Sequence, residues 1–223
     1  MTMRTRRSQE KAEMDASRLL VNSRIVPVVV ISRLERAVPL AECLLEAGID
    51  VIEITLRTNT ALAAIESIAN QVPAMTVGAG SLREPGQIGD IIEAGGQFAV
   101  SPGATAELIG AAHEYNLPLV PGAVTPGEMM NLFAAGYSLQ KFFPAELAGG
   151  APFLKSIHAP LPDIRFMPTG GISVQKAADY LALPNVAAIG GSWITPQHLL
   201  DTGNFAEIGR LAAEAIDMSR VKH

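Results

Sequence analysis

The chain has little of several features that would mark it as secreted, membrane-bound or nucleic-acid-binding. It contains one cysteine, Cys43, among 223 residues, which rules out a disulfide framework and is typical of the reducing cytoplasm. No apolar run approaches the ~18 residues of a membrane-spanning helix. The formal net charge is −5, so the chain lacks the basic surface that phosphates of a nucleic acid require. We therefore expect a cytoplasmic protein with no membrane or nucleic-acid partner.

The first 23 residues carry Arg4, Arg6 and Arg7 but no apolar segment follows them, so they do not resemble a secretory signal. Residues 8–21 have the spacing of an amphipathic helix, which predicts a leader helix within 1–23. The length suits one large domain or two small ones. Because the pattern described next is continuous, we expect one domain over 1–223.

Apolar runs rich in Val and Ile alternate with helical patterns along the whole chain. The predicted strands cover 25–31, 51–56, 75–79, 98–101, 119–121, 139–143, 164–168 and 186–190. The predicted helices cover 35–47, 60–71, 85–94, 104–115, 126–135, 152–157, 174–181, 196–201 and 205–218. Eight strands that are each followed by a helix indicate parallel βα units.

Two α/β architectures accommodate such units: an open doubly wound sheet and a closed (β/α)8 TIM barrel. The strand at 51–56 distinguishes them. One face carries only aliphatic side chains such as Ile52 and Ile54, whereas the other carries Glu53, Thr55 and, just beyond, Arg57. An open sheet covered on both faces would be apolar on both, so a barrel interior that becomes polar toward its mouth is favoured.

Lys141 is the residue around which the chemistry is predicted. It lies within L-Q-K-F-F-P (139–144), a β-favouring run closed by Pro144. One interpretation is an edge strand whose lysine faces water and prevents aggregation. The other is a desolvated amine that stays partly uncharged, among residues such as Leu139 and Phe143, and acts as a nucleophile toward a carbonyl.

The ends of other strands supply groups that fit the second interpretation. Glu53 is a candidate proton shuttle for amine–carbonyl chemistry, although a buried Lys–Glu ion pair without chemistry is the alternative. Glycine pairs follow the last two predicted strands, at 170–171 and 190–191. Such pairs are often only turns, but after these strands, and with Ser192 adjacent, they are typical of a phosphate site.

The histidines and the remaining glycine motif carry no further function. His113, His158, His198 and His223 lack carboxylate or cysteine partners at ligand spacing, so no metal site is expected. The G-A-G at 78–80 is a poor dinucleotide fingerprint, because Arg83 stands where the third glycine would be. Cys43 lies in a helical pattern and is expected to be a small buried hydrophobe.

At these residues the chain resembles the 2-keto-3-deoxy-6-phosphogluconate (KDPG) / 4-hydroxy-2-oxoglutarate (KHG) aldolase family, class I pyruvate aldolases on a (β/α)8 barrel. The resemblance extends from about Ile25 to the terminal helix. It rests on motifs in order: P-V-V-V from 27, E-I-T-L-R-T from 53, V-G-A-G from 77, F-A-V-S-P-G from 98, P-L-V-P-G from 118, K-F-F-P-A-E from 141, P-T-G-G-I from 168 and I-G-G-S-W from 189.

The resemblance implies that Lys141 forms the Schiff base and that Glu53 is the general acid/base. The substrate-binding residues it implies are Arg57 and Ser81 for the pyruvyl carboxylate, Thr169, Pro102 and Phe143 as lining, and Gly170, Gly171, Gly191 and Ser192 at the distal phosphate. The family usually has threonine where this chain has Ser81, so a methyl group is lost from the pocket. The resemblance also implies a phosphorylated keto acid as substrate, no cofactor or metal, a homotrimer, and a place in the Entner–Doudoroff pathway.

Three rival functions remain open from the sequence. The same chemistry on the epimeric galactonate sugar acid, or on 4-hydroxy-2-oxoglutarate, differs by contacts to one hydroxyl or one phosphate. A phosphate-binding isomerase or synthase without a Schiff base would retain most activity without Lys141. A non-catalytic metabolite-binding barrel would be stabilised by its ligand but would show no turnover.

Overall fold

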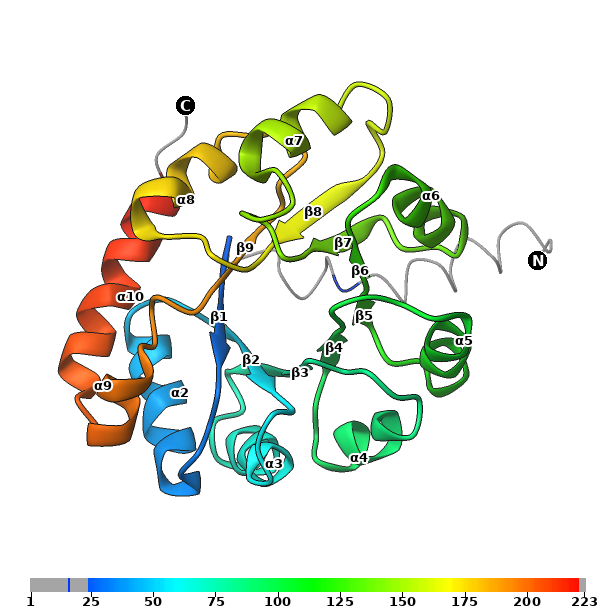
Figure 1. Ribbon diagram of the computed structural model, residues 1–223. Coiled ribbons are helices and arrows are strands. Elements are labelled where there is room, and N and C mark those ends of the chain that lie inside the picture. The colour runs from blue at the N-terminus through cyan, green and yellow to red at the C-terminus, as the bar shows by residue number, and fades with distance from the viewer. Residues whose placement is uncertain (1–15, 17–23, 221–223) are drawn as a thin grey trace.

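The computed structural model describes Ala16 and residues 24–220, and Figure 1 shows its helices placed around a central group of strands. The predicted leader helix at 8–21 lies outside the described residues, except for Ala16. The strands are β1 (Ile25–Val29), β2 (Val51–Thr55), β3 (Thr76–Gly80), β4 (Phe98–Val100), β5 (Leu119–Val120), β6 (Gly122–Ala123), β7 (Leu139–Phe142), β8 (Arg165–Pro168) and β9 (Ile189–Gly191). The helices are η2 (Leu34–Arg36), α2 (Ala37–Glu46), α3 (Ala61–Gln71), α4 (Gln87–Glu93), α5 (Ala106–Tyr115), α6 (Pro126–Ala134), α7 (Gly150–Ile157), α8 (Val174–Leu181), α9 (Gln197–Thr202) and α10 (Phe205–Arg220).

Every strand and helix predicted within the described residues overlaps an observed one, with ends that differ by a few residues. The helix expected to begin at 35 opens as the 3-10 turn η2 before α2. The strand expected at 186–190 begins only at Ile189, while Val186 forms an isolated bridge with Phe166. Gly48 and Gly136 follow α2 and α6 with φ of +90° and +109°, the left-handed geometry that ends a helix.

Within residues 24–220 all strand pairings are parallel, and the strands form two sheets. The first has the order β5-β4-β3-β2-β1-β9 and the second has the order β6-β7-β8. Strands β1 to β5 follow sequence order in the first sheet, β6 to β8 follow it in the second, and β9 returns to lie beside β1. This order differs from the doubly wound order 3-2-1-4-5-6. The structure shows a parallel α/β fold, although the strands divide into two sheets where the sequence predicts one closed barrel.

The division falls at Pro121, inside the predicted strand 119–121. β5 pairs with β4 on one side of this proline, and β6 pairs with β7 on the other. Proline has no N–H to donate to a ladder, but its carbonyl accepts a bond of 2.8 Å from the backbone N of Lys141. At the opposite junction, Thr169, the residue after β8, forms an isolated parallel bridge with Gly190 of β9.

The alternation predicted for β2 is confirmed by its packing. Ile52 and Ile54 belong to the large aliphatic cluster that also contains helix residues such as Leu40 and Ile65. Val51 instead packs in a second cluster drawn from strands of both sheets: Val26, Phe98, Val100, Val120, Leu139 and Met167. This second cluster is a buried apolar layer on the strand faces that point away from the helices. The candidate site lies next to it, toward the carboxyl ends of the strands.

Candidate functional site

Lys141 and Glu53 lie together, on strands that belong to different sheets. Lys141 Nζ is 3.6 Å from Glu53 Oε1. The side chains are 6% and 0% exposed, respectively. Lys141 therefore does not face water on an edge strand, and that interpretation of the sequence is wrong.

The strand geometry explains why Lys141 and Glu53 lie close together and are buried. Side chains two residues apart in a strand share a face, so Lys141 stands one step beyond Leu139, and Glu53 one step beyond Val51. Leu139 and Val51 both belong to the second apolar cluster. The amine and the carboxylate thus rest on that cluster and point toward the carboxyl ends of the strands, where α/β enzymes bind ligands.

Gly80 makes room for the carboxylate. A Cβ at this position of β3 would lie 2.1 Å from Glu53 Oε1 and 2.6 Å from Glu53 Cγ. The sequence identified V-G-A-G (77–80) as a motif, but it did not show that the Glu53 side chain occupies the space where a side chain at Gly80 would lie.

Neither oxygen of Glu53 has a hydrogen-bond partner among the described residues. The 3.6 Å separation from Lys141 Nζ is longer than an ordinary hydrogen bond. A buried ion pair that serves only stability needs further hydrogen bonds to offset desolvation. The Glu53 carboxylate lacks them within the described residues, so the arrangement fits two groups held for chemistry better than it fits a structural salt bridge.

Two predicted lining residues lie beside Lys141. The ring centroid of Phe143 is 5.2 Å from Lys141 Nζ, within the range of a cation–π contact. Gly122 is the register partner of Lys141 in the neighbouring strand. A Cβ on Gly122 would lie 2.2 Å from the carbonyl oxygen of Pro102, so the backbone of Pro102 packs over the strand next to the amine.

Arg57 and Ser81 meet just beyond the ends of β2 and β3. Arg57 Nε donates a hydrogen bond of 3.2 Å to Ser81 Oγ. Ser81 is half-buried and has a positive φ of 59°, which is uncommon for a residue with a side chain. A guanidinium and a hydroxyl held together at this edge present donors suited to a carboxylate.

The two glycine pairs lie on neighbouring strand ends, because Thr169 bridges to Gly190. Gly170 and Gly171 have φ of +103° and +77°, and Gly191 ends β9. Ser192 follows it and is exposed. The loops expected to bind a phosphate therefore lie side by side.

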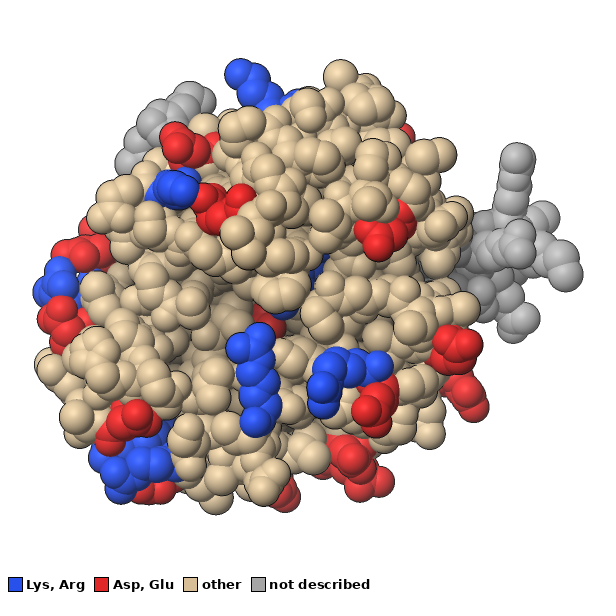
Figure 2. Space-filling model, in the orientation of Figure 1, with Lys and Arg blue, Asp and Glu red and all other residues tan. Residues whose placement is uncertain are grey.

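Figure 2 shows a hollow near the centre of the face that Figure 1 presents, with basic and acidic atoms inside it. Basic side chains also stand beside its rim. Basic groups at the rim of a hollow attract an anionic ligand toward it.

Sequence reasoning missed three residues beside the glycine loop: Glu146, Lys176 and Tyr180. The Glu146 carboxylate accepts hydrogen bonds from Tyr180 Oη at 2.6 Å and from Lys176 Nζ. The hydrogen bond from Lys176, followed by that from Tyr180, holds the pKa of Glu146 below its ordinary value. Burial, together with this carboxylate, raises the pKa of Tyr180. The only signal in the sequence was the K-F-F-P-A-E motif, in which Glu146 closes the run that Lys141 opens.

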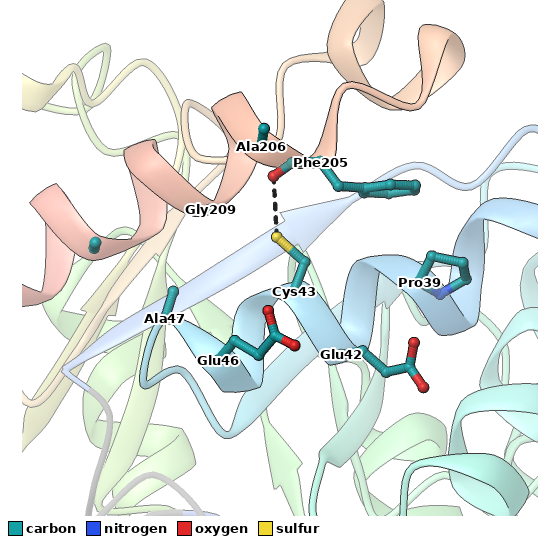
Figure 3. Close-up of a pocket in the computed structure, with 9 residues that line it drawn as sticks. Pro39, Glu42, Cys43, Glu46, Ala47, Phe205, Ala206 and Gly209 are labelled. Atoms are coloured by element: carbon teal, nitrogen blue, oxygen red, sulfur yellow. Dashed lines mark hydrogen bonds between the residues drawn. The ribbon is translucent and has the colours of Figure 1, made fainter.

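A separate groove of 520 Å³ lies between α2 and α10 and includes none of the predicted site residues. Figure 3 shows Cys43 there, with its thiol directed at the backbone of α10. Cys43 Sγ donates to the carbonyl of Phe205 at 3.2 Å, and burial raises the pKa of the thiol. Cys43 is half-buried where the sequence predicted a buried residue. The raised pKa makes it a poor nucleophile.

Within the described residues, no three His, Cys, Asp or Glu side chains gather where they could hold a metal ion. His113 stacks on Tyr137, with ring centroids 5.6 Å apart. In the same part of the chain, no helix has the length and apolarity needed to cross a membrane.

A parallel α/β fold with a buried amine, a buried carboxylate and two adjacent glycine loops at one edge is typical of a lysine-dependent class of enzyme. Comparison with known proteins specifies that class. A sequence model described as "KDPG and KHG aldolase" matches residues 17–211. The KHG/KDPG aldolase of Escherichia coli K12 is 45% identical over 206 residues, which are 92% of this chain and 97% of that protein. The 2-dehydro-3-deoxy-phosphogluconate aldolase of Dickeya dadantii is 46% identical over 90% of this chain and 94% of its own.

A solved structure agrees. The KDPG aldolase of Legionella pneumophila, with pyruvate captured as a covalent carbinolamine, superposes with a TM-score of 0.87 at 44% identity, covering 89% of this chain and 97% of that one. The chain belongs to the KDPG and KHG aldolase family, whose members are lyases.

Proposed function

We propose that the protein is a class I aldolase that cleaves 2-keto-3-deoxy-6-phosphogluconate to pyruvate and D-glyceraldehyde 3-phosphate through a Schiff base on Lys141. The observation that carries the proposal is the buried pair of Lys141 and Glu53, 3.6 Å apart and without other hydrogen bonds to the carboxylate. The covalent carbinolamine of the Legionella enzyme supports the same chemistry here. The reaction needs no external cofactor, because the lysine itself supplies the electron sink.

The first half of the reaction forms the imine. Unprotonated Lys141 Nζ attacks the C2 ketone and gives a carbinolamine. Glu53 then donates a proton to the C2 hydroxyl, which leaves as water, and the protonated imine remains on Lys141. A general acid within reach of this oxygen is what the buried carboxylate provides.

The second half breaks the carbon–carbon bond. Glu53 takes the proton of the C4 hydroxyl, the C3–C4 bond breaks, and its electron pair moves onto the imine to give an enamine. Glyceraldehyde 3-phosphate leaves. The enamine is protonated at C3, and water hydrolyses the imine to release pyruvate and free Lys141.

The remaining predicted residues hold the two anionic ends of the substrate apart. In this proposal Arg57 and Ser81 bind the pyruvyl carboxylate, and Gly170, Gly171, Gly191 and Ser192 bind the distal phosphate. Thr169, Pro102 and Phe143 line the space between. The hydrogen bond of Arg57 to Ser81 and the Thr169–Gly190 bridge support these two assignments.

We further propose that the two sheets close into one (β/α)8 barrel in a single domain. Pro121 connects β5 to β6 without a break in the chain, and β8 adjoins β9 through the Thr169–Gly190 bridge. The apolar cluster shared by strands of both sheets fills the interior that such closure requires.

A homotrimer, a cytoplasmic location and a role in the Entner–Doudoroff pathway are proposed on the family resemblance alone. Light scattering of the purified chain tests the first: a mass three times that of the chain is expected, and a monomer or dimer would contradict it.

Steady-state assays of the gluconate substrate, its galactonate epimer and 4-hydroxy-2-oxoglutarate test the activity itself. We expect the highest kcat/KM with the gluconate, activity with 4-hydroxy-2-oxoglutarate as well, and loss of all activity in Lys141→Met. A higher kcat/KM with the epimer would reassign the substrate. Activity retained in Lys141→Met would replace the Schiff-base proposal with an isomerase or synthase.

A further inference from the structure

Glu146 joins two parts of the site that are far apart in sequence. It lies in the turn that follows β7, five residues after Lys141. Its carboxylate accepts hydrogen bonds from two side chains one helical turn apart on α8, Lys176 and Tyr180. The carboxylate therefore links the strand that carries the amine to the helix that follows the glycine loop.

The turn after β7 also forms direct backbone hydrogen bonds with the glycine loop at 169–171. The backbone N of Glu146 donates to the carbonyl of Gly170 at 3.2 Å, and that of Ala145 donates to Thr169 at 2.8 Å. A Cβ on Gly171 would lie 3.0 Å from Glu146 Cβ. Main-chain and side-chain contacts thus fix the loop at 169–171 from one side.

The negative charge of Glu146 is balanced by the positive charge of Lys176. A lone carboxylate beside a loop that binds a phosphate would repel that phosphate. Lys176 neutralises Glu146, and the lowered pKa of Glu146 shows that the anionic form is the one stabilised. The Tyr180 side chain is buried, so its hydroxyl depends on Glu146 for a partner, as buried polar groups generally need one.

We propose that Glu146 is a positioning residue for the distal phosphate: through Lys176, Tyr180 and its own backbone, it holds the Gly170–Gly171 loop at a fixed distance from Lys141. It touches no reacting atom. It therefore affects the binding of the phosphorylated substrate and leaves Schiff-base formation with pyruvate unchanged. This inference rests on the proposed function, because it assigns a support to that phosphate site.

The test compares a phosphorylated ligand with an unphosphorylated one. Glu146→Ala removes both hydrogen bonds to the carboxylate, so the KM for 2-keto-3-deoxy-6-phosphogluconate is expected to rise about tenfold, which is about threefold for each bond lost. kcat is expected to stay within about twofold, since the reacting groups are untouched. The pyruvate concentration that gives half-maximal trapping by borohydride should be unchanged. Tyr180→Phe, which removes one of the two side-chain contacts and keeps the helix, should raise the same KM about threefold.

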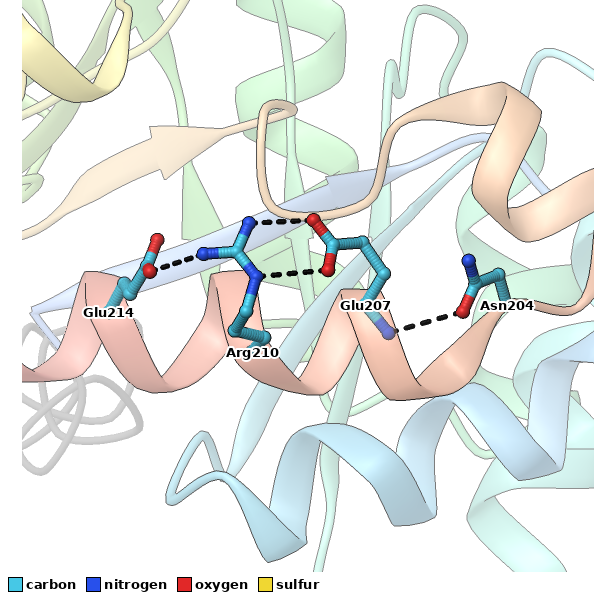
Figure 4. A network of polar contacts seen from close by, with 4 residues as sticks. All are labelled: Asn204, Glu207, Arg210 and Glu214. Carbon is cyan, nitrogen blue, oxygen red and sulfur yellow. Dashed lines mark hydrogen bonds and ion pairs between the residues drawn. The ribbon is translucent and has the colours of Figure 1, made fainter.

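Glu207→Ala is the matched control. Figure 4 shows Glu207 on α10 in an ion pair as well, with Arg210 between it and Glu214. This pair is exposed and contacts no residue assigned to the site, so its loss should leave both readouts unchanged.

The outcomes separate the two proposals. An unchanged KM in both Glu146→Ala and Tyr180→Phe would overturn the positioning role. Equal losses with the sugar phosphate and with pyruvate would overturn it too, because they would show a general structural effect. Failure of the unmodified protein to trap pyruvate would instead refute the Schiff-base function and would be seen before any variant is made.

Discussion

Replacing Gly80 with alanine should displace the carboxylate of Glu53 while the fold survives. The new Cβ would lie 2.1 Å from Glu53 Oε1, 2.6 Å from Cγ and 2.7 Å from Cδ. The backbone cannot yield easily, because β3 is paired on both sides and the carbonyl of Gly80 accepts a bond of 2.8 Å from Leu56 N. The carboxylate must therefore move.

The expected effects on stability and on catalysis differ in size. Oε1 needs to move by roughly 1.5 Å to reach an ordinary contact distance of ~3.5 Å. Overpacking of this kind costs about 1–3 kcal/mol of unfolding free energy, which lowers Tm by about 2–4 °C for each kcal/mol in a chain of this size. A misplacement of about 1 Å in a catalytic group costs about 100-fold in rate.

The assay is kcat for aldol cleavage, with Tm measured in parallel. Gly110→Ala on α5 is the matched control, because a Cβ there meets nothing within 4 Å; it should retain full activity. A Gly80→Ala protein that folds and turns over at the unmodified rate would show that the position of Glu53 does not matter for the reaction.

Three further results are expected. Glu53→Gln keeps the shape of the side chain but cannot shuttle a proton, so kcat should fall by about 10²–10⁴; a kcat within a few-fold of the unmodified enzyme would contradict its role. The folded-state pKa of Glu146 is lowered, so its stabilising contribution is present above the ordinary carboxyl pKa and is lost as the pH falls through the folded-state value. Chemical denaturation of the unmodified protein and of Glu146→Gln should therefore show a difference at pH 7 that shrinks as the pH falls below the ordinary carboxyl pKa, whereas a constant difference would refute the assignment. Finally, the raised pKa of Cys43 predicts slower alkylation by iodoacetamide at pH 8 than a free cysteine shows, and faster alkylation would contradict it.

The strand pattern allowed much of this site to be predicted from the sequence. Once β2 was known to alternate, Glu53 had to stand on the face opposite the helices. Lys141 was expected at the same edge, because parallel strands bring their carboxyl ends to one edge, and the 3.6 Å separation from Glu53 agrees with this. Local periodicity carries that information, and the packing of Ile52, Ile54 and Val51 confirms it.

Contacts between distant segments could not be read in the same way. Glu146 and Tyr180 are 34 residues apart, and their contact depends on how α8 packs against the turn after β7. The space that Gly80 provides for Glu53 depends on the pairing register of β2 and β3. The fifth predicted strand divides at Pro121 because the residues before it pair with β4 and the residues after it pair with β7. No local sequence pattern encodes this change of partner.

Schiff-base formation on Lys141 is tested most directly by treating the protein with pyruvate and borohydride and mapping the modified peptide by mass spectrometry. We expect one reduced adduct per chain, on Lys141, and none in Lys141→Met. An adduct on Lys155 or Lys176, or no adduct on a folded protein, would contradict it.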